Sequence, residues 1–440
     1  MRTDNRIDAQ TGIGTTWLLS AIMTLFLFQT LLENYFSQAS YIDEGLAALF
    51  FGVFVWDLIV SGEARIRELA VCFLILWATA AGLYGNWKFG IQDTNSAIYL
   101  DIVSHFKYAL IYLGVTSAAR KQQWNMAEAA RIPVLLAKGY LIVLFVFGVL
   151  NIFVDLGMYG GIRYGLRNYA FVFGTPGIVT NTVLYIIMLL LLDAALHEER
   201  LNKGFLLMAI AVLIMVIKSR SLILAATVLV LFESFVLEKK QNMRLRILGI
   251  AIIGGLIGYP QYQDYFVNGV TANRGTAPRQ LFWQGGLRLF KEYFPYGTGF
   301  GTFGSSTAAT NYSSLYYILE FNTVTGMQPS NTMYLNDTFW PMIFTQLGLI
   351  GMIPYILLLI IIFYDIYRNA KRSGSLYIRF AAYLYIANVL FSSIQSSYPC
   401  NNSMVMMTFI AALMPYCISA KPERETGEAE RYDPEVRHGY

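Results

Sequence analysis

The chain is divided into a succession of apolar runs, each about as long as a helix that crosses a lipid bilayer. A bilayer core about 30 Å thick needs about 20 apolar residues per helix, and roughly twelve segments of the sequence meet this length. They are 15–36, 44–61, 66–86, 97–118, 132–153, 177–196, 204–218, 221–237, 245–260, 340–364, 377–397 and 402–419. Hydrophobic residues make up 56% of the chain and charged residues only 14%, too few for a water-facing surface. These features predict an all-α polytopic membrane protein and exclude disordered, fibrous and nucleic-acid-binding classes.

One late stretch interrupts this apolar pattern. Residues 261–339 are rich in Gly, Tyr, Asn, Thr and Ser, which predicts a folded segment outside the membrane. We therefore expect a transmembrane bundle of about nine spans over 1–260, a large external loop over 261–339, three spans over 340–420 and a cytoplasmic tail over 421–440. The first apolar run is too long for a cleaved signal peptide, so we expect it to remain as a span. The three cysteines have no metal-ligand spacing, which predicts neither a zinc site nor a disulfide framework.

Lysine and arginine concentrate in alternate connections between the spans. Because cytoplasmic loops carry an excess of these residues, the richer set is predicted to be cytoplasmic, with both termini inside and residues 261–339 outside. The richer set consists of the basic residues of the tail and Arg2, Arg6, Arg65, Arg67, Arg120, Lys121, Arg131, Arg200, Lys203, Lys239, Lys240, Arg244, Arg246, Arg368, Lys371 and Arg372.

The basic residues predicted to lie outside gather mainly in three places: before the sixth span, after the seventh, and in the large loop. They are Lys88, Arg163, Arg167, Lys218, Arg220, Arg274, Arg279, Arg288 and Lys291. Positive charge on the translocated side runs against the insertion bias, so the grouping indicates an anionic ligand; solvated surface arginines are the alternative. Arginine outnumbers lysine six to three in this group, and its planar guanidinium suits bidentate phosphate binding.

Two motifs lie in the first two of these places. Arg163 and Arg167 precede a Gly-Thr-Pro-Gly turn at 174–177 that opens a helix, which would bring guanidinium groups beside free backbone N–H donors. Contact with lipid headgroups is the alternative for this loop. Lys218-Ser-Arg220 separates two apolar runs near the membrane interface. Snorkelling to water is the default for Lys218, and for Arg220 it competes with phosphate contact.

Two further motifs lie in and after the large loop. The helical spacing of Arg279, Trp283 and Gly286 places them on one helix face. The Gly-rich turn at 297–304 follows, and it lacks the strand context of a nucleotide-binding motif. Asn336-Asp337 stands at the mouth of the tenth span, which continues through Gln346-Leu-Gly-Leu-Ile-Gly. Asp337 is a candidate for a general base and also for a helix cap.

In their order and common outward placement, these motifs resemble those of the O-antigen polymerases and O-antigen ligases, the Wzy-type enzymes of bacterial polysaccharide assembly. The matching pieces run from about Arg163 to Gly351, whereas the first five spans and the tail match only in hydrophobicity. The resemblance implies a glycosyltransferase-C-like fold in the bacterial inner membrane, with the active site on the periplasmic side. It also implies a polyprenyl-pyrophosphate-linked oligosaccharide as donor, the bilayer and a chain-length regulator protein as further partners, and neither cofactor nor metal.

The implied chemistry is an inverting glycosyl transfer, in which fixed guanidinium groups stabilise the charge on the departing pyrophosphate. We therefore take Asp337, Arg279, Arg220 and Arg167 as catalytic candidates, with Asp337 as the base. Aromatic rings of the loop could stack on sugar faces. The substrate-binding candidates are Arg163, Arg274, Arg288, Trp283, Tyr334 and Asn336.

Four functions remain open, one of them a non-catalytic assembly partner in cell-wall synthesis, and we expect a polymerase that extends the non-reducing end of another lipid-linked repeat unit. Ligases of the family carry a histidine near the position of Asn336, whereas this chain has only His105, His197 and His438, which are expected in a span or in the cytoplasm. We interpret His105 and Lys107 as satisfied polar residues inside the bundle. A flippase or transporter for a lipid-linked substrate is the third candidate, but no half-to-half repeat is visible in the sequence.

Overall fold

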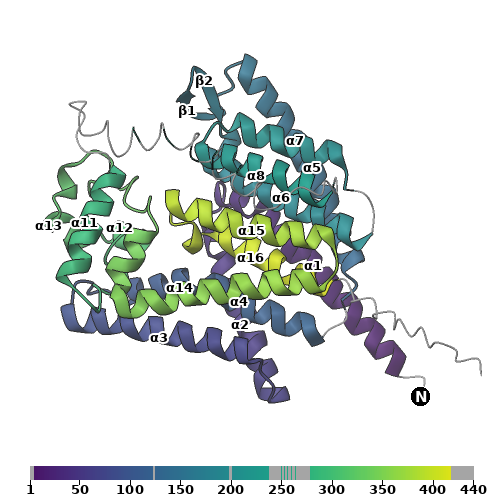
Figure 1. Cartoon of the computed structure of the whole chain (residues 1–440), viewed down its shortest axis with the longest axis horizontal. Helices are drawn as coiled ribbons and strands as arrows, with labels where there is room; N and C mark the ends of the chain where they lie inside the picture. The colour runs from purple at the N-terminus through teal and green to yellow at the C-terminus, as the bar shows by residue number, and fades with distance from the viewer. Residues whose placement is uncertain are drawn as a thin grey trace, which may run out of the picture.

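The computed structural model describes residues 4–121, 124–197, 201–236 and 278–417, with a few isolated positions between 237 and 277 (Figure 1). The side chains are described from Gly14 onward. The predicted ninth span at 245–260, the start of the large loop with Arg274, and the tail at 421–440 all lie outside the continuously described residues.

Eight helices of the described chain are long and apolar enough to cross a membrane. They are α1 (Asp4–Glu33, apolar from Gly14), α2 (Ile42–Ser61), α3 (Ile66–Phe89), α4 (Asn95–Lys121), α5 (Met126–Phe153), α6 (Pro176–Leu196), α14 (Trp340–Arg372) and α15 (Leu376–Gln395). They coincide with eight of the predicted spans, from 15–36 to 177–196 and then 340–364 and 377–397. The protein is therefore a helical, polytopic membrane protein.

Three other predicted spans are shorter helices: α7 (Lys203–Met215), α8 (Ser219–Phe235) and α16 (Asn402–Leu413). At about 1.5 Å per residue, α7 is about 20 Å long, less than the roughly 30 Å of a bilayer core. The predicted span at 204–218 is therefore not confirmed: its helix ends at Met215, and Lys218 lies in the turn before α8.

A β-hairpin between α5 and α6 was not predicted. Strands β1 (Tyr159–Arg163) and β2 (Leu166–Tyr169) pair antiparallel, and a short 3-10 helix, η2 (Phe171–Phe173), follows them. Strands this short carry too few alternating residues to be recognised in the sequence. The predicted turn at 174–177 is confirmed, because Gly174 adopts φ +65° and Pro176 opens α6 at a position where its missing N–H costs nothing.

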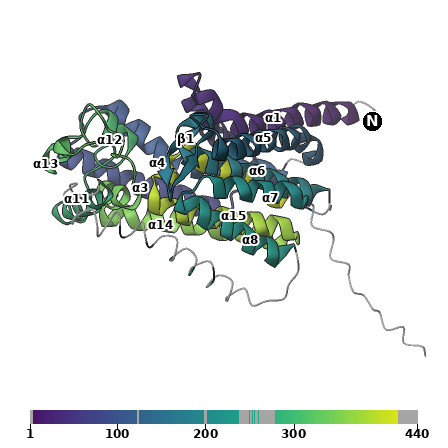
Figure 2. The same cartoon turned by 90° about the horizontal axis from the view of Figure 1, so that it is seen from above.

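The described part of the large loop, residues 278–339, forms a unit that we call the loop module. It contains α11 (Pro278–Glu292), α12 (Ser306–Thr310), α13 (Ser314–Ile318) and the 3-10 helix η4 (Phe321–Thr323). Figures 1 and 2 show α11, α12 and α13 at the end of the bundle opposite the N-terminus. The module has its own apolar core, formed by Phe282, Leu289, Phe303, Ala308, Ala309, Leu315, Tyr316, Phe321, Met327 and Leu335.

The Gly-rich turn docks the loop module onto a break in α14. Gly348 has φ +57° and ψ −165°, so the predicted tenth span is not one continuous helix. The break frees two carbonyl groups, and the backbone N–H groups of Thr298 and Gly299 donate to Thr345 and Gln346 at 2.8 and 2.9 Å. The turn therefore serves the packing of the module against the bundle.

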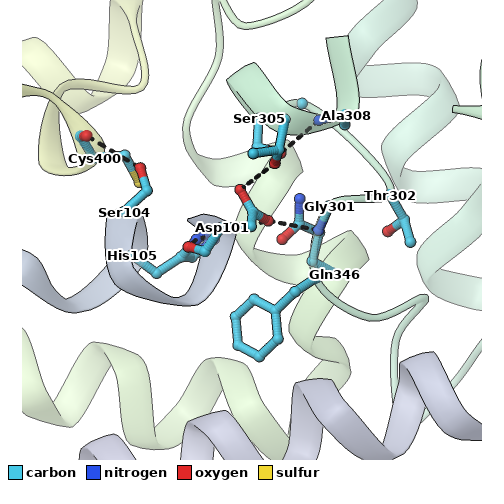
Figure 3. A network of polar contacts seen from close by, with 12 residues as sticks. Asp101, Ser104, His105, Gly301, Thr302, Ser305, Ala308, Gln346 and Cys400 are labelled. Atoms are coloured by element: carbon cyan, nitrogen blue, oxygen red, sulfur yellow. Dashed lines mark hydrogen bonds and ion pairs between the residues drawn. The ribbon is translucent and has the colours of Figure 1, made fainter. Parts of the chain in front are cut away.

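Asp101 of α4 anchors the same turn from the other side (Figure 3). Its carboxylate accepts a hydrogen bond from the backbone N–H of Gly301 at 2.6 Å and one from the hydroxyl of Thr307 at 2.8 Å. His105, one turn along α4, is buried with Nδ1 2.8 Å from the Asp101 carbonyl oxygen. The first half of the chain thus holds the loop module in place.

Candidate functional site

Four basic side chains and one acid from separate segments gather at the loop-module end of the bundle. Lys218 occupies the turn between α7 and α8, and Arg220 the first turn of α8. Burial lowers the pKa of Lys218, and the nearby charges of Arg163, Arg279 and Arg220 lower it further, whereas Asp337 raises it. We call these five residues the basic cluster.

The turn that carries Lys218 and Arg220 is built by local hydrogen bonds. Ile217 has φ +52°, a left-handed conformation that reverses the chain after α7. The backbone N–H of Lys218 donates to the Ser221 hydroxyl at 3.2 Å, and that hydroxyl donates to the Lys218 carbonyl at 2.7 Å. These bonds satisfy backbone groups at the start of α8 and fix where both cations emerge.

Arg220 is a buried guanidinium held by neutral groups. Its Nη2 donates to the Gly177 carbonyl at 2.9 Å and to Asn181 Oδ1 at 2.8 Å, and the group lies 6.0 Å from the centre of the Tyr398 ring. The side chain is 8% exposed, and no ion pair with a carboxylate is found for it among the described residues. A buried charge without a counter-charge is costly, which favours an anionic ligand here.

Arg279 and Asp337 form the other edge of the cluster. Arg279 Nη2 lies 3.6 Å from Asp337 Oδ2 and donates to the Gln395 carbonyl at 3.3 Å. Burial raises the pKa of the Asp337 carboxyl above its ordinary value, although Arg279 and Lys218 oppose the shift. The N-cap of α14 is Phe339, with no side-chain hydrogen bond, so Asp337 does not cap this helix.

The predicted face of α11 is confirmed and explains how Arg279 reaches Asp337. Trp283 packs against Phe344 of α14, with ring centres 5.8 Å apart. A Cβ at Gly286 would lie only 3.1 Å from Phe344, so a glycine allows the two helices to approach closely. Arg279, on the same face one turn earlier, is thereby directed toward the segment that precedes α14.

Arg167 contacts the C-terminal end of α5 and the residues just after it. It donates to the Asn151 carbonyl at 3.1 Å and lies 3.7 Å from Asp155, at the end of α5. The hairpin register pairs Arg163 with Leu166 and Arg167 with Ile162, so the two arginines belong to adjacent cross-strand pairs. Adjacent pairs point to opposite faces of a hairpin, so Arg163 and Arg167 lie on different faces although the sequence places them in one motif.

The remaining candidates lie beside the cluster or away from it. The Asn336 carbonyl, next to Asp337, accepts a hydrogen bond from the Ser397 hydroxyl at 3.0 Å. Tyr334 packs against the core of the loop module, and its N–H donates to the Gly326 carbonyl. Arg288 is exposed on α11. Tyr334 and the buried Tyr316 thus help to form the module's core rather than an open aromatic groove.

Several polar residues that support the site were not selected from the sequence. The Asn181 side chain accepts a hydrogen bond from Arg220, and the Gln395 backbone carbonyl accepts one from Arg279. Asn181 lies between two threonines at the start of an apolar run, where a polar side chain needs a partner, whereas a backbone carbonyl leaves no signal in the sequence. Lys107 is buried and forms ion pairs with Asp43 and Glu44, as expected for a satisfied residue inside the bundle.

No protein-family model and no curated protein matches this chain. Within the described ranges, His, Cys, Asp and Glu side chains form no group of three or more that could hold a metal ion. The basic cluster is therefore the feature from which we infer function.

Proposed function

We propose that this protein is a polysaccharide polymerase that transfers a glycan from a polyprenyl pyrophosphate carrier to the non-reducing end of another lipid-linked repeat unit. The convergence of four cationic side chains and one carboxylate supports this proposal. With all five groups ionised, the cluster has three positive charges in excess (four minus one). That surplus suits a pyrophosphate at a membrane surface better than it suits a neutral lipid or a sugar.

The proposed reaction inverts the anomeric centre without a metal. The acceptor hydroxyl oxygen attacks the anomeric carbon, the bond to the pyrophosphate oxygen breaks, and the leaving oxygen keeps the electron pair. Asp337 accepts the hydroxyl proton, and its raised pKa makes it a stronger base than an ordinary aspartate. Arg220 and Arg279, with Arg163 and Lys218, stabilise the charge that develops on the leaving group; losing one such donor costs about 10²–10³ in rate.

The proposal includes a topology and a location. We propose twelve spans in a glycosyltransferase-C-like fold, with both termini in the cytoplasm and the basic cluster on the periplasmic side of a bacterial inner membrane. The position of the loop module opposite the N-terminus agrees with this topology (Figure 1). The donor is a polyprenyl-pyrophosphate-linked oligosaccharide, and a chain-length regulator is a candidate partner.

The test is polymer formation by the purified protein. Given a polyprenyl-pyrophosphate oligosaccharide without nucleotide sugar or divalent metal, the protein should produce a ladder of longer lipid-linked glycans. Arg279→Ala and Asp337→Ala should abolish the ladder. Arg379→Ala is the matched control, because Arg379 of α15 is also half-buried but lies over the Phe235 ring, outside the cluster. A normal ladder from both cluster variants would contradict the site, and a single addition to lipid A core would indicate a ligase.

A flippase for the same lipid-linked substrate is the second candidate. The observation that favours it is the buried ion-pair group of Lys107, Asp43 and Glu44, because ionisable residues inside a bundle often mark transport paths. Vesicles that contain the protein and a fluorescent lipid-linked oligosaccharide would distinguish the two. Transfer between leaflets without ladder formation would favour the flippase and contradict the polymerase.

A further inference from the structure

A continuous chain of hydrogen bonds leads away from the basic cluster across the ends of four helices. Arg220 donates to Asn181 Oδ1 at 2.8 Å, and Asn181 Nδ2 donates to the Ser403 hydroxyl at 2.8 Å. That hydroxyl donates to Asn402 Oδ1 at 3.2 Å, and Asn402 Nδ2 donates to Glu33 Oε1 at 2.7 Å. The chain therefore joins a guanidinium on α8 to a carboxylate on α1.

The direction of every donor in this chain is set by its two ends. A guanidinium can only donate and an ionised carboxylate can only accept. Asn181 must therefore turn its oxygen to Arg220 and its amide nitrogen to Ser403, while Asn402 turns its nitrogen to Glu33 and its oxygen to Ser403. Ser403 then accepts from one amide and donates to the other. Both ends require the same order, so the chain has one fully satisfied arrangement.

The hydrogen-bond chain is shielded from water at Ser403 and anchored at its far end. Ser403 is only 4% exposed, so water cannot easily replace its hydroxyl. Gln29, 1% exposed, donates to Glu33 Oε1 and to Asp43 Oδ1, both at 3.1 Å. Asp43 in turn forms the buried ion pair with Lys107. Glu33 is therefore part of a rigid polar group rather than a free surface carboxylate.

We propose that Asn181 and Ser403 are positioning residues, anchored through Asn402 at Glu33, that orient Arg220 for a pyrophosphate group. This inference rests on the proposed function. Arg220 Nη2 donates to two acceptors, the Gly177 carbonyl and Asn181 Oδ1. These two bonds set the direction in which the rest of the guanidinium points. Without the Ser403 hydroxyl, the Asn181 amide loses the partner that holds its nitrogen. If the Asn181 amide then rotates, its own N–H groups face the N–H groups of Arg220, and the hydrogen bond between the two side chains is lost.

Removing and restoring the Ser403 hydroxyl tests this role. Ser403→Ala breaks the chain, and Ser403→Thr keeps a hydroxyl at the same position. Thr180→Val is the matched control, because Thr180 neighbours Asn181, is 1% exposed, and donates its hydroxyl to Pro176 within its own helix. Binding is measured by calorimetry with farnesyl pyrophosphate, and farnesyl alcohol serves as the uncharged comparison. Kd for farnesyl pyrophosphate should rise about tenfold in Ser403→Ala, the effect of about one hydrogen bond.

Further readouts separate positioning from packing. Ser403→Thr should recover most of the affinity, and Thr180→Val should bind like the wild type. In the polymer assay, Ser403→Ala should lower kcat at least as much as it raises KM, because a misdirected guanidinium fails to follow the charge of the transition state. A lower Tm with unchanged Kd and kcat would overturn the positioning role.

The remaining outcomes distinguish this inference from the proposed function. If the wild type binds farnesyl pyrophosphate well and Ser403→Ala binds it equally, the positioning role is wrong while the anion site stands. If the wild type binds farnesyl pyrophosphate no better than farnesyl alcohol, both are overturned. Should Ser403→Ala fail to fold, Asn181→Asp replaces it. That variant keeps the oxygen for Arg220 but adds a counter-charge, so affinity should fall more than tenfold, and unchanged affinity would overturn the proposal.

Discussion

Replacing Arg220 by lysine keeps the charge of the cluster but removes the guanidinium fork. A guanidinium has five N–H donors, and the two on Nη2 of Arg220 bind the Gly177 carbonyl and Asn181 Oδ1. Three remain for the proposed pyrophosphate ligand. A lysine ammonium has three donors, and satisfying the same two acceptors leaves one. Arg220→Lys therefore removes two charge-assisted donors without exposing an unpaired acceptor.

The size of the effect follows from this count. A hydrogen bond to a charged group contributes about 1.5–3 kcal/mol net. Loss of one effective bond gives roughly 2 kcal/mol, and loss of both gives roughly 4 kcal/mol. We therefore expect kcat/KM to fall about 30- to 1,000-fold, with little change in Tm.

The assay is initial-rate polymer extension with purified lipid-linked oligosaccharide, together with a thermal denaturation curve in the same detergent. Arg379→Lys is the matched control: Arg379 lies 5.8 Å from the Phe235 ring, as Arg220 lies 6.0 Å from the Tyr398 ring, but outside the cluster. Its kcat/KM should stay within about threefold of the wild type. An Arg220→Lys enzyme that also stays within threefold would refute the idea that the fork of Arg220 binds the leaving group.

Three other perturbations have expected outcomes. The activity kcat/KM should fall on the acid side at a pH above the usual aspartate range, because burial raises the pKa of Asp337. It should fall on the alkaline side below the usual lysine range, because the pKa of Lys218 is lowered. Asp337→Asn should leave only residual activity, and a rate measurement of that residual activity should show no acid limb. Gly299→Ala should loosen the loop module, because Gly299 has φ +91° and an added Cβ would lie 2.5 Å from a backbone nitrogen of α3. Limited proteolysis should therefore cut the loop module of this variant faster than that of the wild type. Lys107→Met should destabilise the fold by about 3–5 kcal/mol by leaving the Asp43 carboxylate buried and unpaired, with a lower Tm as the readout.

The sequence predicted the elements whose signals are local. An apolar run of about 20 residues is visible without any partner, and eight such runs are helices of that kind. The spacing of Arg279, Trp283 and Gly286 likewise predicted a shared helix face, which packs on α14. These properties depend on neighbours along the chain, so they could be predicted from it.

What could not be predicted depends on partners that are distant in sequence. Arg163 and Arg167 lie on opposite faces of a hairpin of two short strands, and no local sequence pattern predicts the register of that hairpin. Gly348 is compatible with an apolar helix, yet the loop module breaks the helix there by pairing with its carbonyl groups. The sequence left Asp337 as a candidate for a helix cap or a base, and only the structure shows that it lies beside Arg279 and that Phe339 is the N-cap of α14.

The N-terminal spans illustrate the same limit and bear on function. Their sequence carries no motif that points to a function, only the hydrophobicity of membrane-spanning helices. In the structure, Asp101 of α4 binds the Gly-rich turn, and Glu33 of α1 ends the hydrogen-bond chain from Arg220. These spans thus contact the loop module directly and the buried guanidinium through a chain of hydrogen bonds. Because an anion site stabilises a transition state only when its donors are fixed in advance, we expect both carboxylates to contribute to the proposed activity, although neither touches the proposed substrate.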